Sequence, residues 1–422
     1  MASLPPHHLI LITNHFPYGT GEAFLESEIP HLIRSFDKVV VLTRNAHHSI
    51  PPVTGLNFSH ERIDHRSNVV EIVRTVALAV VHSRTVLSLI RSELRYLKSR
   101  EGTKSFKKRA VLFHDLFKAL ALSFWINRSI KKNWLTGTVV LYSYWLTSSA
   151  LATLFVKPEG ISVKRISRAH RADVYESIQA HGYLSFREVL AQGLDGIFVV
   201  SNDGLHHLGN NIDAKWHSKL HLARLGTRKP ESIPANSSSG RRVIVSCSFL
   251  TPVKRVHLII DALALIESLD IQWIHFGDGP LRAELETRAA QKLSSRTIIQ
   301  AGFKGPVANK DLLQFYCTYH VDLFINTSSS EGIPVSMMEA QSFGIPILAM
   351  DVGGVREIVG PDNGRLLQKD NPPGEIAKAI TELLSLPEDE KDRMRKNAFD
   401  NWNLNYNADK NFSTFIAAIL NL

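Results

Sequence analysis

The sequence predicts an α/β protein of two doubly wound domains facing a cleft. At 422 residues, the chain is longer than one hydrophobic core usually organises. Its apolar fraction of 44% and charged fraction of 21% are typical of a globular protein. Along the chain, two series of apolar β-rich runs alternate with helical patterns, and a stretch rich in proline, serine and glycine separates the two series.

The first series predicts a strand, helix, strand unit followed by further strands. The amphipathic segment EAFLESEIPHLIRSF (22–36) lies between the first two apolar runs, which indicates a helix that crosses between parallel strands. Residues 67–135 then become helical and basic, and strands resume after them. We therefore predict an N-terminal domain over 1–228 with a basic helical insertion at about 67–135. Its strands are expected at 8–16, 38–44, 137–145, 163–170 and 194–201.

The second series predicts a domain of the same kind over 242–395. The segment RKPESIPANSSSGRR (228–242) interrupts every hydrophobic period, so residues 229–241 are expected to form a linker. Helical patterns such as RVHLIIDALALIESL (255–269) separate several of the apolar runs that follow. Ligands of doubly wound domains bind at the carboxyl ends of the strands, which is where a site is expected. The strands are expected at 242–250, 271–279, 296–303, 321–328 and 344–351.

Composition and charge restrict the function classes. Cys247 and Cys317 are the only cysteines, and nothing near them has zinc-ligand or redox spacing, which favours a reduced cytosolic compartment. The N-terminus lacks the basic flank and cleavage site of a signal peptide, and no window reaches the roughly 18 apolar residues of a spanning helix. The net charge of +9 arises in residues 84–132, where 13 Lys or Arg stand against three Asp or Glu. Such a segment suits an anionic membrane surface, with a solvated helix face as the alternative.

The stretch SSSEGIPVSMMEAQSFGIPIL (328–348) carries the candidate chemistry. It predicts a polar loop with Glu331 and then a helix that Pro334 could start, with Glu339 about two turns further on. Amides at such a helix N-terminus favour a phosphate, and a loop carboxylate can accept hydrogen bonds from sugar hydroxyls. Eight helical residues rise about 12 Å, which suits a sugar, a diphosphate and a ribose held in sequence. On spacing alone, a helix cap at Glu331 with a surface Glu339 is an equal alternative.

The segment EGIPVSMMEAQSFGIPILAMDVGGVREIV (331–359) closely resembles the signature of family 4 glycosyltransferases. The elements E-G-x-P, E-A at the second glutamate, the G-x-P strand and a later G-G-x-x-E occur in order and without gaps. This family belongs to the glycosyl transferases group 1, retains the anomeric configuration, and has the GT-B fold of two Rossmann-like domains. The resemblance therefore implies a retaining, hexosyltransferase-type enzyme (EC 2.4) that moves a sugar from a nucleotide diphosphate sugar to an acceptor hydroxyl.

Two further segments of the second domain resemble the family. VSCSFLTPVKRVHLIIDAL (245–263) is similar to the strand, loop and helix whose lysine, here Lys254, meets the donor diphosphate. Many members carry an arginine where this chain has Phe249 and a glycine where it has Arg255. The sequence leaves open whether Arg255 replaces the missing phosphate contact. FGDGPLRAELE (276–286) resembles the loop that lies beside the nucleotide base.

The N-terminal half and the C-terminus also resemble the family. SRAHRADVYE (167–176) is similar to the segment whose histidine, here His170, approaches the donor sugar, and FPYGTGEAFLESEI (16–29) resembles the glycine-bearing first loop. An ordinary histidine and a simple glycine turn are the alternatives. By the same resemblance, residues 396–422 end in a helix that packs back on the N-terminal domain.

The resemblance implies a set of site residues and a mechanism. The catalytic residues are Glu331, His170 and Lys254, and the leaving diphosphate is stabilised by Lys254 and by loop amides, with no cofactor and no obligatory metal. No carboxylate is placed as a covalent nucleophile, which favours front-face attack with the leaving phosphate helping to take the acceptor proton. The expected donor-binding residues are Glu339, Gly332, Ile333, Pro334, Val335, Arg255, Gly277, Asp278, Gly19 and Gly21.

The resemblance also implies partners and a setting. We expect a UDP- or GDP-sugar donor and a glycan or lipid-linked acceptor, in polysaccharide, lipopolysaccharide or exopolysaccharide biosynthesis. The expected location is cytoplasmic, with peripheral contact to the inner face of an anionic membrane through 84–132 and no nucleic acid partner. A catalytically silent relative serving as an interaction subunit is an alternative because of Phe249. A nicotinamide oxidoreductase is disfavoured, since GTGEAF and GDGPLR each lack the third glycine of G-x-G-x-x-G.

Overall fold

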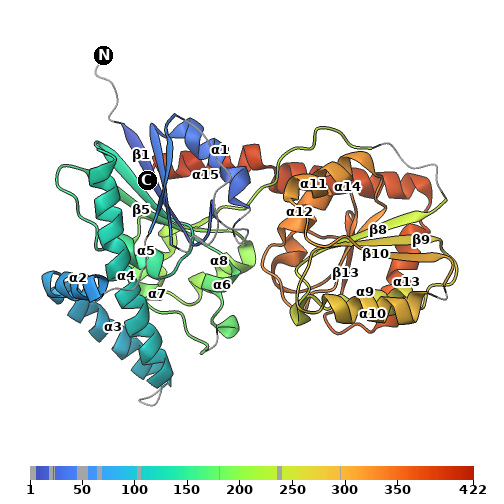
Figure 1. Ribbon diagram of the computed structural model, residues 1–422, viewed down its shortest axis with the longest axis horizontal. Coiled ribbons are helices and arrows are strands. Elements are labelled where there is room, and N and C mark those ends of the chain that lie inside the picture. The colour runs from blue at the N-terminus through green and yellow to red at the C-terminus, as the bar shows by residue number, and fades with distance from the viewer. Residues whose placement is uncertain are drawn as a thin grey trace. The chain divides into compact units, whose positions relative to one another are not determined.

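Two parallel β-sheets organise the computed structural model, one in each of two units (Figure 1). Unit 1 comprises Met1–Ala223 with Phe412–Leu422, and unit 2 comprises Arg224–Asn411. The predicted α/β class is confirmed, and all ten predicted strands are present, with boundaries shifted by a few residues. The structure describes residues 6–18, 22, 24–44, 56–63, 69–101, 106–179, 181–234, 240–294 and 296–422.

The sheet of unit 1 has seven parallel strands in the order β3-β2-β1-β4-β5-β6-β7. The central strand β1 pairs with β2 on one side and β4 on the other, so Leu9 lies opposite both Val39 and Val140. The order reverses between β1 and β4, which is the switch point of a doubly wound sheet. The strands are β1 (His7–Thr13), β2 (Lys38–Thr43), β3 (Phe58–Arg62), β4 (Thr138–Ser143), β5 (Ser162–Ala169), β6 (Gly196–Val199) and β7 (Leu220–Leu222).

The sheet of unit 2 repeats this order with six parallel strands, β10-β9-β8-β11-β12-β13. Its switch point therefore lies between β8 and β11. The strands are β8 (Arg242–Cys247), β9 (Ile271–Phe276), β10 (Ile299–Phe303), β11 (Leu323–Asn326), β12 (Ile347–Met350) and β13 (Gly364–Leu367).

Helices connect the parallel strands and cover the sheets (Figure 1). Those of unit 1 are α1 (Leu25–Ser35), α2 (Val69–Val81), α3 (Ser83–Glu101), α4 (Phe106–Lys132), α5 (Ser148–Thr153), α6 (Arg171–Val174), α7 (Arg187–Gly193) and α8 (Asn202–Gly209). Those of unit 2 are α9 (His257–Leu263), α10 (Arg282–Leu293), α11 (Asn309–Thr318), α12 (Val335–Ser342), α13 (Pro373–Leu384) and α14 (Glu388–Asn405). The last helix is α15 (Ala408–Leu420), most of which belongs to unit 1.

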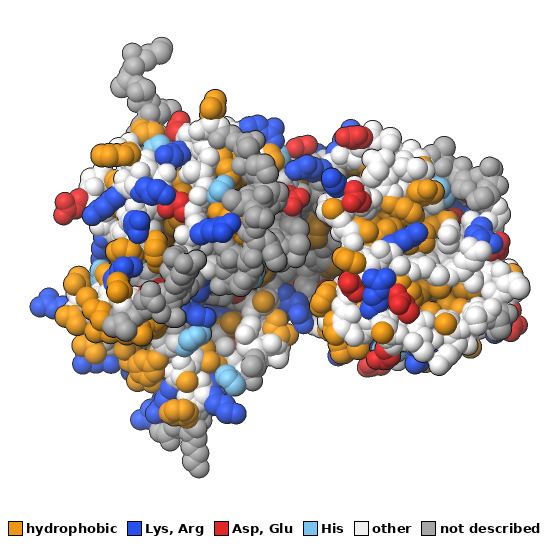
Figure 2. All heavy atoms as spheres, in the orientation of Figure 1, with side chains coloured by type: hydrophobic (Ala, Val, Ile, Leu, Met, Phe, Trp, Pro, Cys, Tyr) orange, Lys and Arg blue, Asp and Glu red, His pale blue; other side chains and the backbone are white. Residues whose placement is uncertain are grey.

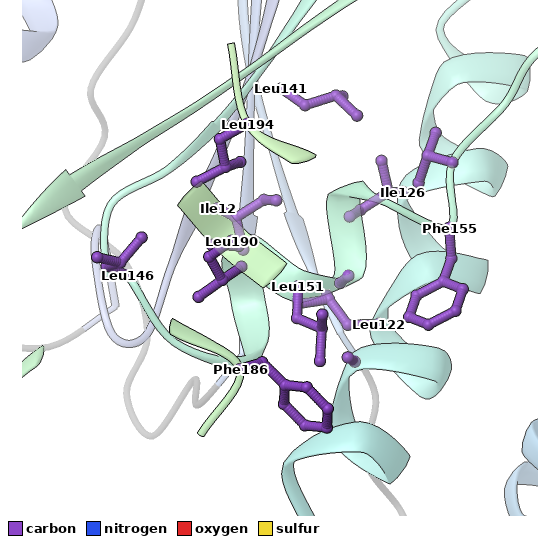
Figure 3. Packing of buried hydrophobic residues seen from close by; sticks show 14 of the residues in the cluster. Ile12, Leu122, Ile126, Leu141, Leu146, Leu151, Phe155, Phe186, Leu190 and Leu194 are labelled. Atoms are coloured by element: carbon purple, nitrogen blue, oxygen red, sulfur yellow. The ribbon is translucent and has the colours of Figure 1, made fainter. Parts of the chain in front are cut away.

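Alternate residues of β1 face two layers of the core of unit 1. Ile10 and Ile12 pack in the layer that contains α4, α5 and α7, whereas Leu9 and Leu11 pack in the layer that contains α1 and α15. Because both faces of the sheet are covered, its central strands are continuous apolar runs. Figure 3 shows the first layer, with Ile12, Leu122, Ile126, Leu141, Leu146, Leu151, Phe155, Phe186, Leu190 and Leu194 labelled.

Helix α4 belongs to this core. By length and composition it is apolar enough to cross a membrane, so the expectation that no segment reaches that threshold was wrong for α4. However, 44% of its most apolar 18-residue window is buried inside the structure. Its ten buried residues include Leu112, Leu116 and Ile126, which pack in the first core layer. Core helices of this kind satisfy the same length and composition test.

Helix α15 is held to unit 1 by apolar and ionic contacts. Its Phe415 packs in the second core layer, and the buried Arg168 guanidinium lies 4.1 Å from the centre of the Phe415 ring. Arg168 Nη2 lies 3.2 Å from Glu28 Oε2, and the Tyr142 hydroxyl donates to Glu28 at 2.8 Å. A buried cation needs such compensation, so Arg168 joins α1, β4, β5 and α15 in one cluster.

Candidate functional site

Two loops meet at the switch point of the unit 2 sheet. The loop after β8 contains the turn Pro252–Lys254, and the loop after β11 leads into α12. The Ser329 amide donates to the Val253 carbonyl at 2.8 Å, and the Thr327 hydroxyl donates to the Lys254 carbonyl at 3.1 Å. These bonds hold the loops side by side at the carboxyl ends of β8 and β11, where ligands of doubly wound sheets bind.

The central contact of this site is an ion pair between the two loops. Lys254 Nζ lies 2.6 Å from Glu331 Oε1, and the Asn326 side-chain amide donates to the same oxygen at 3.3 Å. The side chains of Lys254 and Glu331 are 24% and 10% exposed, so the pair is partly shielded from water. The structure thus brings together two residues with predicted catalytic roles that lie 77 positions apart.

Arg255 follows Lys254 but turns its guanidinium to the backbone of the other loop. Its Nε donates to the Thr327 carbonyl at 2.8 Å, and its Nη2 lies 3.4 Å from the Ser328 carbonyl oxygen. Its φ of +49° lies in the left-handed region, which glycine adopts more readily. These bonds use two of the five guanidinium N–H donors. A donor-binding role for Arg255 remains a prediction that depends on the other three.

The later glycines of segment 331–359 pack against its first residues. Gly353 has a φ of +54°, and a Cβ atom at this position would lie 2.0 Å from the Glu331 carbonyl oxygen. The Gly354 amide donates to the Gly332 carbonyl at 3.0 Å, and Ile333 is buried beside them. Only glycine fits at residue 353, so the G-G pair supports the conformation of the Glu331 loop.

Helix α12 carries Glu339 into the interior of unit 2. The helix begins at Val335, directly after Pro334. Glu339 is 7% exposed and accepts a hydrogen bond from the Asn309 side chain at 2.6 Å, so the alternative of a surface Glu339 is wrong. Burial raises the pKa of Glu339 to about 7, although the Asn309 bond opposes this. Burial, with a contribution from Glu339, also raises the pKa of the Cys247 thiol at the end of β8 to about 12.

The loop after β9 lies against the loop after β8. Gly277 has a φ of +133°, and a Cβ atom there would lie 2.0 Å from the Ser248 carbonyl oxygen. The Leu250 amide donates to the Asp278 carbonyl at 2.8 Å. Phe249, between these contacts, is 60% exposed. Gly277 and Asp278 are therefore placed beside the loop that carries Lys254, while a contact with a nucleotide base remains a prediction.

His170 lies at the end of β5 in unit 1, in an aromatic environment. Its ring centre is 4.8 Å from that of Tyr144 and 4.7 Å from that of Trp145, and the residue is 9% exposed. Burial, with the Arg168 charge, lowers the pKa of His170 to about 3, so the ring is neutral near pH 7. Neither ring nitrogen has a hydrogen-bond partner among the residues that the structure describes. The third predicted catalytic residue is thus a neutral imidazole of the other unit.

The switch point of unit 1 is organised by Glu22, a residue that the sequence did not single out. Its carboxylate accepts from the amides of Asn14, His15 and Phe16 at 3.1, 2.7 and 2.8 Å, and from the Trp145 indole N–H. Glu22 is 1% exposed and joins the segment after β1 to the segment after β4. The predicted donor-binding residues Gly19 and Gly21 lie outside the described part of the chain.

Two asparagines were also missed, because neither stands in a recognisable motif. Asn309 bonds Glu339, and Asn326 bonds Glu331 while accepting from the Ser328 amide at 2.9 Å. Both orient a predicted carboxylate. The only sequence signal was the position of Asn326 at the carboxyl end of a predicted strand. Among the described residues, no group of three or more His, Cys, Asp or Glu could hold a metal ion.

Two Rossmann-like units of this strand order give the chain the GT-B fold, which several solved structures share. Sucrose-phosphate synthase from Thermosynechococcus elongatus superposes with a TM-score of 0.66, 15% identity and coverage of 97% of each chain. Anabaena Alr3699/HepE, solved in complex with UDP, has a TM-score of 0.64 and 15% identity, covering 98% of this chain and 100% of its own. At this identity the likeness shows the fold alone.

In sequence, the second half of the chain is similar to known glycosyltransferases. The family model described as Glycosyl transferases group 1 matches residues 228–401. WcaL of Escherichia coli, provisionally named a colanic acid biosynthesis glycosyltransferase, is 27% identical over 186 residues, 41% of this chain and 44% of its own. The GDP-mannose-dependent alpha-mannosyltransferase of Mycolicibacterium smegmatis is 28% identical over 151 residues, 35% of this chain and 36% of its own. The matches span less than half of the length of these relatives.

Proposed function

We propose that the chain is a retaining glycosyltransferase of family 4, a hexosyltransferase that moves a sugar from a nucleotide diphosphate sugar to an acceptor hydroxyl. The observation that carries the proposal is the Lys254–Glu331 pair at the switch point of unit 2, with the buried Glu339 on the adjacent helix. The group 1 family match covers this region and supports the same class.

Each part of the donor has a candidate partner in unit 2. Lys254 and the first amides of α12 suit the diphosphate, because an ammonium group and a helix N-terminus both favour an anion. Glu331 can accept hydrogen bonds from sugar hydroxyls, and Glu339 from the ribose hydroxyls. The pair with Glu331 holds Lys254 in place before the phosphate arrives, which reduces the reorganisation needed during reaction.

The proposed reaction breaks the bond between the anomeric carbon and the phosphate oxygen. Negative charge then develops on the leaving nucleotide diphosphate, where Lys254 and the α12 amides stabilise it. The acceptor oxygen forms the new bond from the same face of the sugar, and its proton passes to the leaving phosphate. His170, neutral near pH 7, can contact the donor sugar without adding charge. No metal or other cofactor is needed in this scheme.

The donor base and the setting are inferred from relatives. One curated relative is named for GDP-mannose, and one structural neighbour was solved with UDP, so both nucleotides are candidates. The name of WcaL supports a role in polysaccharide assembly, with a glycan or lipid-linked acceptor. We place the reaction in the cytoplasm, where nucleotide sugars are used.

Calorimetry with free UDP and GDP tests the binding part of the proposal. The parent protein should bind one of them, and Glu339→Gln should weaken that binding by about tenfold or more, as expected for a lost hydrogen bond to a charged group. Glu331→Gln should weaken binding of the intact nucleotide sugar more than binding of the free nucleotide, because only the former carries the sugar. The exposed Glu375 supplies a control, Glu375→Gln, that should change neither. No binding of either nucleotide by the parent protein would contradict the proposal.

A product assay tests the chemistry. With a binding nucleotide sugar and a soluble acceptor, the anomeric proton signal of the product should show the same configuration as the donor. Inversion of the configuration would refute the retaining mechanism. Binding without transfer or donor hydrolysis would favour the second candidate, a silent interaction subunit, which is suggested by the exposed Phe249 and the backbone-bound Arg255.

A further inference from the structure

Helix α2 is apolar on two opposite sides. Its inner side packs on unit 1, where Thr75 is 2% exposed and Leu78 and Ala79 contact the first core layer. Its outer side is exposed to solvent, although it consists of large aliphatic side chains. We call this side the α2 outer face; its residues, 54 to 76% exposed, are Val70, Ile72, Val73, Val76, Val80 and Val81.

No charged side chain interrupts the α2 outer face. At about 100° per residue, Val73, Val76 and Val80 share one side of the helix, and Glu71 lies toward the opposite side. Arg74, the other charged residue of α2, places its guanidinium 4.0 Å from the centre of the Phe124 ring of α4. A contiguous apolar patch that is exposed marks a site of interaction with a protein, a ligand or a membrane. Because the α2 outer face is exposed, it calls for an apolar partner from outside the described residues of unit 1.

Positive charge predominates on α2 and on the two helices that follow it. In Figure 2, hydrophobic side chains gather over α2 at the lower left, with Lys and Arg side chains at their border. The described parts of α2, α3 and α4 contain 13 Lys or Arg and four Asp or Glu. One of these acids, Glu93, is 3% exposed and accepts a hydrogen bond from the Tyr183 hydroxyl. The exposed cations include Arg84, Arg91 and Lys107.

We propose that the α2 outer face inserts into the interface of an anionic lipid bilayer, with the cations of α3 and α4 at the headgroups. Helices that lie in the membrane plane combine an apolar face with attraction to anionic lipid in this way. The proposal places insertion in residues 70–81, outside the segment 84–132 that the sequence suggested, and assigns that segment the attraction only. It does not depend on the proposed enzymatic activity.

A bilayer fits the charge of this surface better than a second copy of the chain. A two-fold contact through α2 would bring two cationic borders together, and like charges oppose association. Together, α2 and α3 also pass the length and composition test for a broken membrane span, with a bend of 87° between them. Val86 and Leu97 of α3 are buried in the first core layer, however, and the inner side of α2 packs there too, so only the α2 outer face is available for insertion.

Vesicle binding by the full chain tests the proposal. Vesicles of phosphatidylcholine with 30% phosphatidylglycerol should bind the parent protein, and pure phosphatidylcholine vesicles should bind it at least tenfold more weakly. The double variant Val73→Glu with Val76→Glu should reduce the partition coefficient for the anionic vesicles at least tenfold, with an unchanged far-ultraviolet circular dichroism spectrum. Leu265→Glu replaces an exposed aliphatic residue of unit 2 and should bind as the parent does.

A second variant separates insertion from adsorption by charge. The fluorescence of Val76→Trp should shift to shorter wavelength with anionic vesicles and should be quenched by brominated acyl chains. Vesicle binding without this shift, unchanged binding by the double glutamate variant, or no binding by the parent protein would each overturn the proposal. Light scattering could also overturn the proposal. If the parent protein were a dimer and the double glutamate variant a monomer, a second copy of the chain would cover the α2 outer face.

Discussion

The switch points of the two units have the same strand order but opposite chemistry. In unit 2, Lys254 and Glu331 form a partly exposed ion pair whose charges a ligand can share. In unit 1, the Glu22 carboxylate is 1% exposed and already accepts from three backbone amides and an indole. Trp145, which donates to Glu22, also lies against the neutral His170. Topology therefore sets where a site lies, and the side chains placed there decide whether it carries charge for a ligand or stabilises its own loops.

Among the variants that test this comparison, Lys254→Ala is expected to have the largest effect, which is on kcat. If Lys254 stabilises the leaving diphosphate, its loss should lower kcat by about 10²- to 10³-fold, equivalent to about 2.7 to 4 kcal/mol. Steady-state kinetics with the cognate donor measure this. The exposed Lys369 supplies a control, Lys369→Ala, that should retain parent kcat. If Lys254→Ala lowered kcat less than tenfold, the Lys254–Glu331 pair would only stabilise its loops, as Glu22 does in unit 1.

At the switch point of unit 1 we expect a loss of stability. The Glu22 carboxylate accepts hydrogen bonds from four donors. Glu22→Gln removes its charge and replaces one of its two acceptor oxygens by an NH₂ group, which should lower the free energy of unfolding by about 2 kcal/mol. Urea unfolding measures this, with Glu26→Gln on the exposed side of α1 as the control. Equal stability of the two variants would mean that Glu22 is not the centre of that loop.

The third prediction concerns Glu339, whose burial works against stability. Its pKa of about 7 in the folded chain lies above its ordinary value of 4.5, so the folded state binds the proton more tightly. Stability from this group is therefore present below about pH 4.5 and is lost as the pH rises through 7. Glu339→Gln should leave stability nearly unchanged at pH 5 and raise it by about 2 to 3 kcal/mol at pH 8. Urea unfolding at both pH values, with Glu375→Gln as the control, measures the difference, and an equal effect at both would contradict it.

The smallest effect is expected at Phe249. Because the side chain is 60% exposed, Phe249→Arg should change the free energy of unfolding by no more than about 0.5 kcal/mol. If the loop lies near a donor phosphate, the added cation should tighten nucleotide binding by about 0.5 kcal/mol, as for an exposed ion pair. Phe249→Lys should act in the same direction. Weaker nucleotide binding by both variants would place the phosphate away from this loop.

Central strands were predictable because parallel strands buried on both faces are continuous apolar runs. The three strands that the sequence reading missed, β3, β7 and β13, all lie at sheet edges. They are short, and none of their residues is buried except Gly364, so FSHER, LHL and GRLL carry no such run. An edge strand without an apolar run can be recognised only from its neighbour, which a single sequence does not provide. The other edge strand, β10, was predicted from the run in RTIIQAGF.

The site was predictable where its residues are close in sequence. Glu331, Glu339 and the paired glycines stand in one segment, and their motif pointed to them. The direct contact between Lys254 and Glu331 was not predicted, because it depends on the pairing of β8 with β11. Asn309 stands in no motif, and within the segment 16–29 only the glycines were given a role, so Glu22 was passed over. The burial of Glu339 could not be read from spacing, since helix α12 is enclosed on nearly all sides.

Unit 1 is built from two separate parts of the chain, which has a consequence for its folding during translation. Its core is completed by Phe415, Ile416 and Ile419, which lie within the last eleven residues of the chain. A ribosome releases these residues only after the whole of unit 2 has emerged. Until then, the nascent first unit exposes the surface around Arg168 and Tyr142 that α15 covers in the folded chain.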